Sequence, residues 1–94
     1  MNKKIDNELL DKLYEAVLLL DSKDECKKFF HDLCTINELK AMSQRLQVAK
    51  MLKEDIVYQK IAEETGASTA TISRVSRCLN YGAEGYNLML KKMK

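Results

Sequence analysis

Residues 58–79 read YQKIAEETGASTATISRVSRCL, and this stretch decides the fold. Its pattern predicts a helix, a tight turn at Gly66 and a second helix, because glycine readily adopts the left-handed backbone that such a turn needs. Apolar residues at helical spacing would hold the two helices together: Ile61, Ala62, Ile72, Val75 and Leu79. The stretch therefore predicts a helix-turn-helix.

The second helix of this motif would leave a small, polar and basic face outside. That face consists of Thr69, Ala70, Ser73, Arg74 and Arg77. Small side chains let the start of a helix approach base edges, so Thr69 and Ala70 can meet thymine methyl groups and Ser73 a base edge or a phosphate. Both arginines suit phosphates, and Gln59 on the first helix can reach the groove or a phosphate. The pattern predicts a protein that reads double-stranded DNA.

Helix pairs with a glycine corner also occur in proteins that never touch DNA. The alternative from another class is therefore an interaction module whose helix-turn-helix docks on another protein. DNA binding through arginines must weaken steeply as salt rises, so salt dependence separates the two readings.

Upstream of the motif, residues 5–20 predict an amphipathic helix that is apolar over more than one stripe. The stripe comprises Ile5, Leu9, Leu13, Ala16, Val17 and Leu20, and it is widened by Leu10, Tyr14, Leu18 and Leu19. One neighbouring helix cannot cover so wide a surface. We expect a second subunit to supply the other cover, the alternative being a helix at the centre of a monomer.

Two capping boxes, Ser22 with Glu25 and Thr35 with Glu38, predict the starts of the next two helices. The first would run to about residue 34 and bury Cys26, Phe29, Phe30, Leu33 and Cys34. The second would cover 36–53, with a core face of Leu39, Met42, Leu46, Ala49 and Met51 or Leu52.

The remaining boundaries follow from single residues. Val57 is a poor N-cap for the helix at 58–65, whereas Ser68 is a good one for the helix at 69–80. Gly82 and Gly85 predict a flexible corner before a last helix within 84–94. No linker interrupts the chain, so residues 1–94 are expected to form a single domain.

Composition agrees with this reading. The 94 residues include no proline, three glycines and 46% apolar residues, which favours an all-α protein. The net charge is +2, and residues 56–94 hold six basic and three acidic side chains, the sign that nucleic acid requires. A charged start and the absence of a long apolar run predict a cytoplasmic protein that does not use a membrane. Three cysteines fit a reducing compartment without disulfides.

Catalytic and metal chemistry have little support. The group Cys26, His31 and Cys34, with Cys78 as a fourth member, is unlike common zinc sites, because Cys26 and His31 would point roughly 140° apart on one helix. No catalytic triad, phosphate loop or HExxH motif is present. We expect no metal, no cofactor and no enzyme activity.

The stretches TINELKAMSQRLQVAKML and YQKIAEETGASTATISRVSRCLNYGAEGY resemble the Trp repressor superfamily, and within it the YerC/YecD group. This resemblance implies a six-helix, all-α fold that interlocks with a second copy into a homodimer, with 1–55 as the dimerisation core, 58–80 as the helix-turn-helix and 84–94 as the C-terminal helix. It also implies that the DNA-facing positions are Gln59, Ser68, Thr69, Ala70 and Ser73. The function it implies is sequence-specific transcription regulation, usually repression.

The effector pocket of the Trp repressor maps by this resemblance onto Thr35, Arg45, Arg74, Val75 and Cys78. Val75 replaces a glycine there and would intrude on the space of the indole, while Cys78 replaces a serine that bonds the amino group of the ligand. Tryptophan is therefore not expected to bind. A structural or phosphate-binding role of Arg45 and Arg74 is favoured over a pocket for a different small effector.

Overall fold

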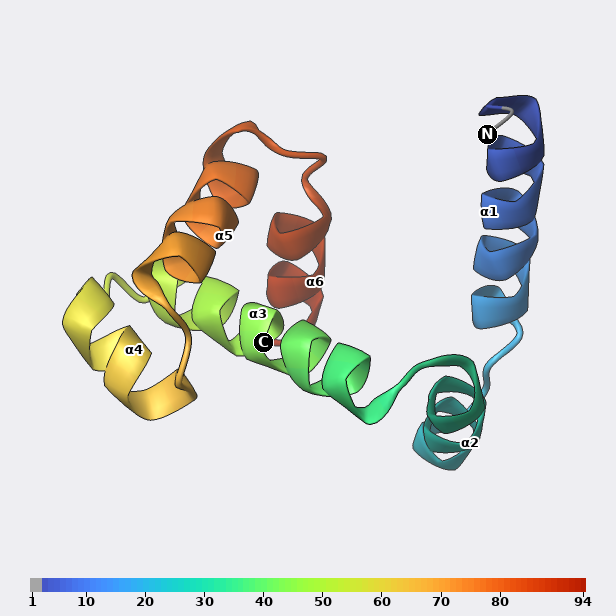
Figure 1. Ribbon diagram of the computed structural model, residues 1–94, viewed down its shortest axis with the longest axis horizontal. Coiled ribbons are helices and arrows are strands. Elements are labelled where there is room, and N and C mark those ends of the chain that lie inside the picture. The colour runs from blue at the N-terminus through green and yellow to red at the C-terminus, as the bar shows by residue number, and fades with distance from the viewer. Residues whose placement is uncertain (1–2) are drawn as a thin grey trace. The chain divides into compact units, whose positions relative to one another are not determined.

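The computed structural model describes the backbone of residues 3–94 and the side chains of residues 7–94, and it is all-α over that range (Figure 1). The helices are α1 (Lys3–Leu18), α2 (Lys23–Leu33), α3 (Ile36–Lys53), α4 (Tyr58–Thr65), α5 (Thr69–Tyr81) and α6 (Gly85–Lys92). The predicted six-helix fold is confirmed, and the predicted helix ends are met to within about two residues. The side chain of Ile5, expected in the first apolar stripe, lies outside the described residues.

The chain divides into two compact units, residues 1–35 and residues 36–94, so α3 belongs with the helix-turn-helix rather than with α1 and α2. The single-domain organisation stays a prediction. In the first unit, the Ser22 hydroxyl accepts a hydrogen bond from the Glu25 amide at 3.1 Å, which confirms the N-cap of α2. The Glu25 carboxylate reaches one residue further back than expected and accepts from the Asp21 amide at 2.8 Å.

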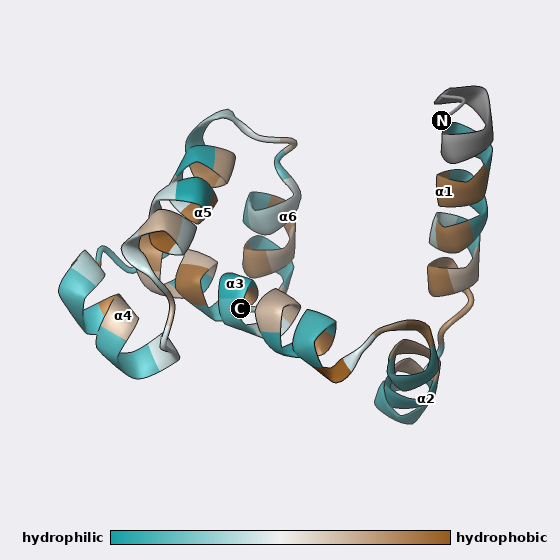
Figure 2. Ribbon diagram, viewed as in Figure 1, coloured by the Kyte–Doolittle hydropathy of each residue, from teal (hydrophilic) through white to brown (hydrophobic). Residues whose placement is uncertain are grey.

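No described side chain of the first unit is fully buried within the single chain. Apolar residues recur along α1 (Figure 2), and Leu18 at its end and Leu19 directly after it are 83% and 82% exposed. The residues of α2 that were predicted to be buried reach only partial burial, and Leu33 is 49% exposed. This correction has a simple reason, since helices of an isolated unit this small offer too little surface to cover one another.

The second unit packs α4, α5 and α6 against α3. Its core consists of Val48, Ala49, Met51, Ile61, Ala67, Ile72 and Val75. The helix-turn-helix anchors were predicted correctly, but Val48 and Ala67 were not foreseen. Val48 is buried because α3 has neighbours on several sides, which a single-face pattern cannot anticipate.

Part of the predicted core face of α3 is wrong for the single chain. Leu39 and Leu46 are only half-buried, and Met42 is 37% exposed. These residues lie in the first two thirds of α3, and the buried residues of the helix all lie from position 48 onward. The early part of α3 therefore carries apolar surface that its own chain does not fully cover.

Two connections differ from the sequence expectation. The turn after α3 places Asp55 in the left-handed region, with φ 60°, and Ile56 donates its amide hydrogen to the Met51 carbonyl at 3.1 Å. At the corner before α6, the left-handed residue is Glu84 at φ 70°, not either glycine. Gly82 is required for another reason, because a Cβ there would meet the Cys78 carbonyl oxygen at 2.5 Å.

Candidate nucleic-acid interface

The turn between α4 and α5 is held by side chains as well as by glycine. Gly66 has φ 74° and donates its amide hydrogen to the Ala62 carbonyl at 2.9 Å, as a left-handed helix end requires. The Thr65 hydroxyl donates to the Ile61 carbonyl at 2.7 Å and accepts from the Ala67 amide at 3.1 Å. These bonds fix the direction in which the chain leaves α4.

Helix α3 also secures this turn. Gln44 donates from Nε2 to the Thr65 carbonyl at 3.0 Å, a bond between residues 21 apart in the chain. Sequence reasoning did not identify Gln44, Thr65 or Ala67. A threonine at the end of α4 is a weak local signal for the hydroxyl bonds, whereas nothing local could have shown the contact from α3.

The start of α5 is capped as predicted. The Ser68 hydroxyl accepts from the Thr71 amide at 3.1 Å, and the two hydroxyl groups are also hydrogen-bonded at 3.1 Å. The amides of Thr69 and Ala70 have no partner within the described residues. Such first-turn amides, together with the positive end of the helix dipole, favour an approaching phosphate.

The face of α5 that was predicted to read DNA lies outside, and the anchoring face lies inside. Ile72 and Val75 are 0% and 1% exposed. All seven residues predicted to contact DNA are exposed: Gln59, Ser68, Thr69, Ala70, Ser73, Arg74 and Arg77. They come from α4, from the residue before α5 and from α5 itself, and all of them belong to the second unit.

The charge of this surface suits a polyanion. α5 contains no carboxylate, and within the described residues neither Arg74 nor Arg77 forms an ion pair. The basic residue of α4, Lys60, is paired with Glu64 at 3.4 Å, and both side chains are largely exposed. Two unpaired guanidinium groups therefore remain available for phosphates.

The positions of the predicted effector pocket fall in different surroundings. Arg45 is half-buried on α3, Arg74 and Cys78 are exposed on α5, and Val75 belongs to the hydrophobic core. Thr35 belongs to the other unit. The burial of Val75 means that its isopropyl group packs between helices, a role that a glycine could not fill.

No group of three or more potential metal ligands gathers anywhere among the described residues. The three cysteines are free; Cys26 and Cys34, which were expected to be buried, are only half-buried, and Cys78 is exposed. Over residues 3–94, no helix combines the length and the apolar character that crossing a membrane demands.

The chain is similar to known proteins over almost its whole length. The model of the Trp repressor protein family matches residues 8–94. An uncharacterised protein of Bacillus subtilis, YerC, is 54% identical over 91 residues, which cover 97% of this chain and 88% of that protein.

Two solved structures are also similar. A TrpR-like protein from Eubacterium eligens superimposes with a TM-score of 0.91 at 51% identity, covering 98% of this chain and 95% of that one. A candidate Trp repressor from Staphylococcus aureus gives a TM-score of 0.88 at 52% identity, covering 92% and 86%.

Proposed function

The chain belongs to the Trp repressor protein family, and on this premise we propose that it regulates transcription by reading a specific DNA sequence through α5, without enzymatic activity. The observation that carries the proposal is the exposed, carboxylate-free face of α5 above two fully buried anchors. Because the buried side chains of Ile72 and Val75 fix α5 on its own chain, the helix can enter the major groove without rearranging.

Each exposed residue has a role in this proposal. Thr69 and Ala70, at the tip of α5, contact thymine methyl groups, and Ser73 contacts a base edge. Arg74 and Arg77 bind phosphates and fix the register of the helix on the duplex. Two further contacts come from Gln59 on α4 and from Ser68, whose hydroxyl keeps an acceptor lone pair beyond its capping bonds.

A homodimer completes the proposal. The first unit exposes apolar side chains in number, among them Leu9, Tyr14 and Leu18 at 60%, 57% and 83%. Ile36, at the start of α3, is also 59% exposed. Apolar area of this extent is costly in water, and a second copy would bury it. The dimer would then present two α5 helices about 34 Å apart, one DNA turn, so the operator should be close to a palindrome.

Tryptophan is not part of the proposed mechanism. Val75 fills the helix interface with its own side chain, and Cys78 lacks the hydroxyl that would hydrogen-bond the amino group of tryptophan. We therefore propose that α5 is held in its reading position without tryptophan.

The proposal is tested by selecting DNA from a random pool and measuring affinity for the selected site by gel shift. Thr69→Asp should weaken binding about tenfold or more, because a carboxylate is placed against DNA, while stability stays within about 0.5 kcal/mol. Gln47→Glu, which adds one negative charge at an exposed position of α3, serves as the matched control. No selected sequence at low salt with folded protein would refute the proposal.

Salt dependence separates DNA reading from protein docking. Removing one phosphate contact per protomer, as in Arg77→Ala, should reduce the slope of log affinity against log salt by about 1.8 for the dimer. A slope that is unchanged in this variant would show that Arg77 does not contact phosphate. Affinity that does not fall with salt would favour a protein partner instead.

A further inference from the structure

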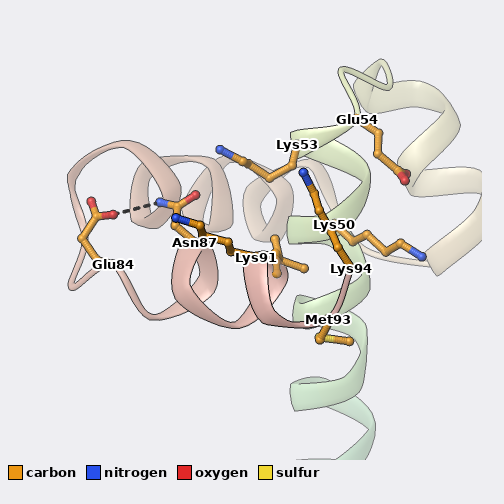
Figure 3. A pocket seen from close by; sticks show the side chains of 9 residues that line it. Lys50, Lys53, Glu54, Glu84, Asn87, Lys91, Met93 and Lys94 are labelled. Carbon is orange, nitrogen blue, oxygen red and sulfur yellow. Dashed lines mark hydrogen bonds between the residues drawn. The ribbon is translucent and has the colours of Figure 1, made fainter.

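A hollow separate from the predicted DNA face lies between the end of α3 and α6 (Figure 3). It has a volume of about 890 Å³, and four lysines line it: Lys50 and Lys53 from the last turn of α3, Lys91 from the last turn of α6, and Lys94. We call it the lysine hollow. None of its lining residues belongs to the predicted DNA contacts.

The lysine charges are not neutralised by ion pairs. Within the described residues, none of the four ammonium groups lies in a salt bridge. Two carboxylates, Glu54 and Glu84, also line the hollow, and Figure 3 shows Lys53, Lys91 and Lys94 between them in this view. Lysines in the last turn of a helix also stabilise that helix by interacting with its dipole. That effect does not explain why lysines from two helices surround one hollow.

A buried acceptor without a partner lies in the same place. Asn87 donates from Nδ2 to the Leu79 carbonyl at 3.0 Å and to Glu84 Oε2 at 3.3 Å. These two acceptors fix the orientation of the amide, since only its nitrogen can donate. The amide oxygen, Oδ1, is buried and has no hydrogen-bond partner among the described residues. Because the atom is buried, a ligand in the hollow does not reach it, and the acceptor that a ligand can reach beside Asn87 is the exposed Glu84 carboxylate.

We propose that the lysine hollow binds a phosphorylated sugar. The lysines would bind the phosphate as point charges, while the two oxygens of the Glu84 carboxylate would accept hydrogen bonds from sugar hydroxyl groups. Leu90 and Met93 supply apolar lining for the carbon skeleton of the ring. A phosphorylated sugar thus has a group for each feature of the site: its phosphate for the lysines, its hydroxyl groups for the carboxylate and its carbon skeleton for the apolar lining.

The same residue links the hollow to the reading helix. Asn87 donates both to the backbone carbonyl of Leu79, which lies in α5, and to Glu84 Oε2, so a ligand on the Glu84 carboxylate contacts the partner of the side chain that ties α6 to α5. Occupancy of the hollow would therefore alter DNA affinity, and this regulatory part rests on the proposed function.

Isothermal titration of the full chain tests the site with glucose 6-phosphate, glucose and inorganic phosphate. Glucose 6-phosphate should bind, and each of the other two should bind about tenfold more weakly or worse, because each lacks one half of the recognition. The variant K53Q/K91Q should lose about tenfold in affinity per lysine, whereas K27Q/K28Q, which removes the same charge from exposed positions of α2, should bind like the wild type.

Asn87→Ala removes the amide that holds the Glu84 carboxylate, so it should weaken binding of glucose 6-phosphate but leave binding of inorganic phosphate unchanged. No heat with glucose 6-phosphate, or equal losses in both double-lysine variants, would overturn the site. A change of oligomeric state in K53Q/K91Q, seen by sedimentation, would show that a second copy occupies the hollow and would also overturn it.

The regulatory part has its own readout. Glucose 6-phosphate should shift the affinity of the wild type for its selected DNA by several-fold, and K53Q/K91Q should abolish that response. If the ligand binds but DNA affinity does not change, the coupling is refuted and the site stands. Isothermal titration with glucose 6-phosphate needs no DNA, so it tests the site even if the chain binds no DNA.

Discussion

Replacing Gly66 with alanine should destabilise the protein through the backbone alone. A Cβ at Gly66 would meet only Gln44 Nε2, at 3.8 Å, which is ordinary contact, so space is not the problem. The problem is φ 74°, a left-handed conformation that disfavours a residue with a Cβ by roughly 1–2 kcal/mol. Alanine restricts the unfolded chain and returns about 0.4–1 kcal/mol. The net loss should be about 1 kcal/mol, which lowers the melting temperature of a domain this size by about 4–8 °C.

Circular dichroism melts at a fixed protein concentration measure this effect, because association with a second copy makes the melting temperature depend on concentration. Gly85→Ala is the matched control, since a Cβ there meets no heavy atom within 4 Å and its φ is not positive. It should leave stability unchanged or raise it slightly. Gly66→Asn should lose less than Gly66→Ala, because asparagine tolerates the left-handed region. Equal effects of alanine at positions 66 and 85 would refute the reasoning.

Three other substitutions probe the cap, the turn and the apolar first unit. Ser68→Ala removes the cap of α5 and should cost about 1 kcal/mol in a urea melt, against a change within about 0.5 kcal/mol for the exposed Ser73→Ala. Gln44→Ala leaves the Thr65 carbonyl without its donor and should lower stability by about 1 kcal/mol in the same melt; no loss would mean that water replaces the amide. Leu18→Glu places a charge in the surface proposed to bury a second copy, so sedimentation should show a monomer; a dimer as tight as the wild type would place the interface elsewhere.

Much of the helix-turn-helix could be predicted because its determinants are local. A cap joins residues three positions apart, as Ser68 and Thr71 do, and a left-handed turn needs one permissive residue, Gly66. The helical repeat then assigns Ile72 and Val75 to the buried face and their neighbours to the exposed one. Helix ends and the candidate reading face follow from such short-range rules.

Other features depended on which helices meet. Val48 is buried because α4, α5 and α6 all pack on α3, and no single-face pattern in α3 foretells this. The bond from Gln44 to the turn and the corner that places Glu84 at φ 70° likewise depend on how distant segments cross. The lysine hollow is the clearest case, since α3 and α6 each contribute lysines to it.

The sequence by itself thus determined the six helices, the turn at Gly66 and the face of α5 that points outward, because caps, glycine and the helical repeat act within a few residues. Only the tertiary structure decided that the last third of α3 forms the core, which apolar side chains of residues 7–35 stay exposed, and where Asn87 leaves an oxygen without a hydrogen-bond partner. These depend on contacts between residues far apart in the chain, whose energy is set by the packing of whole helices.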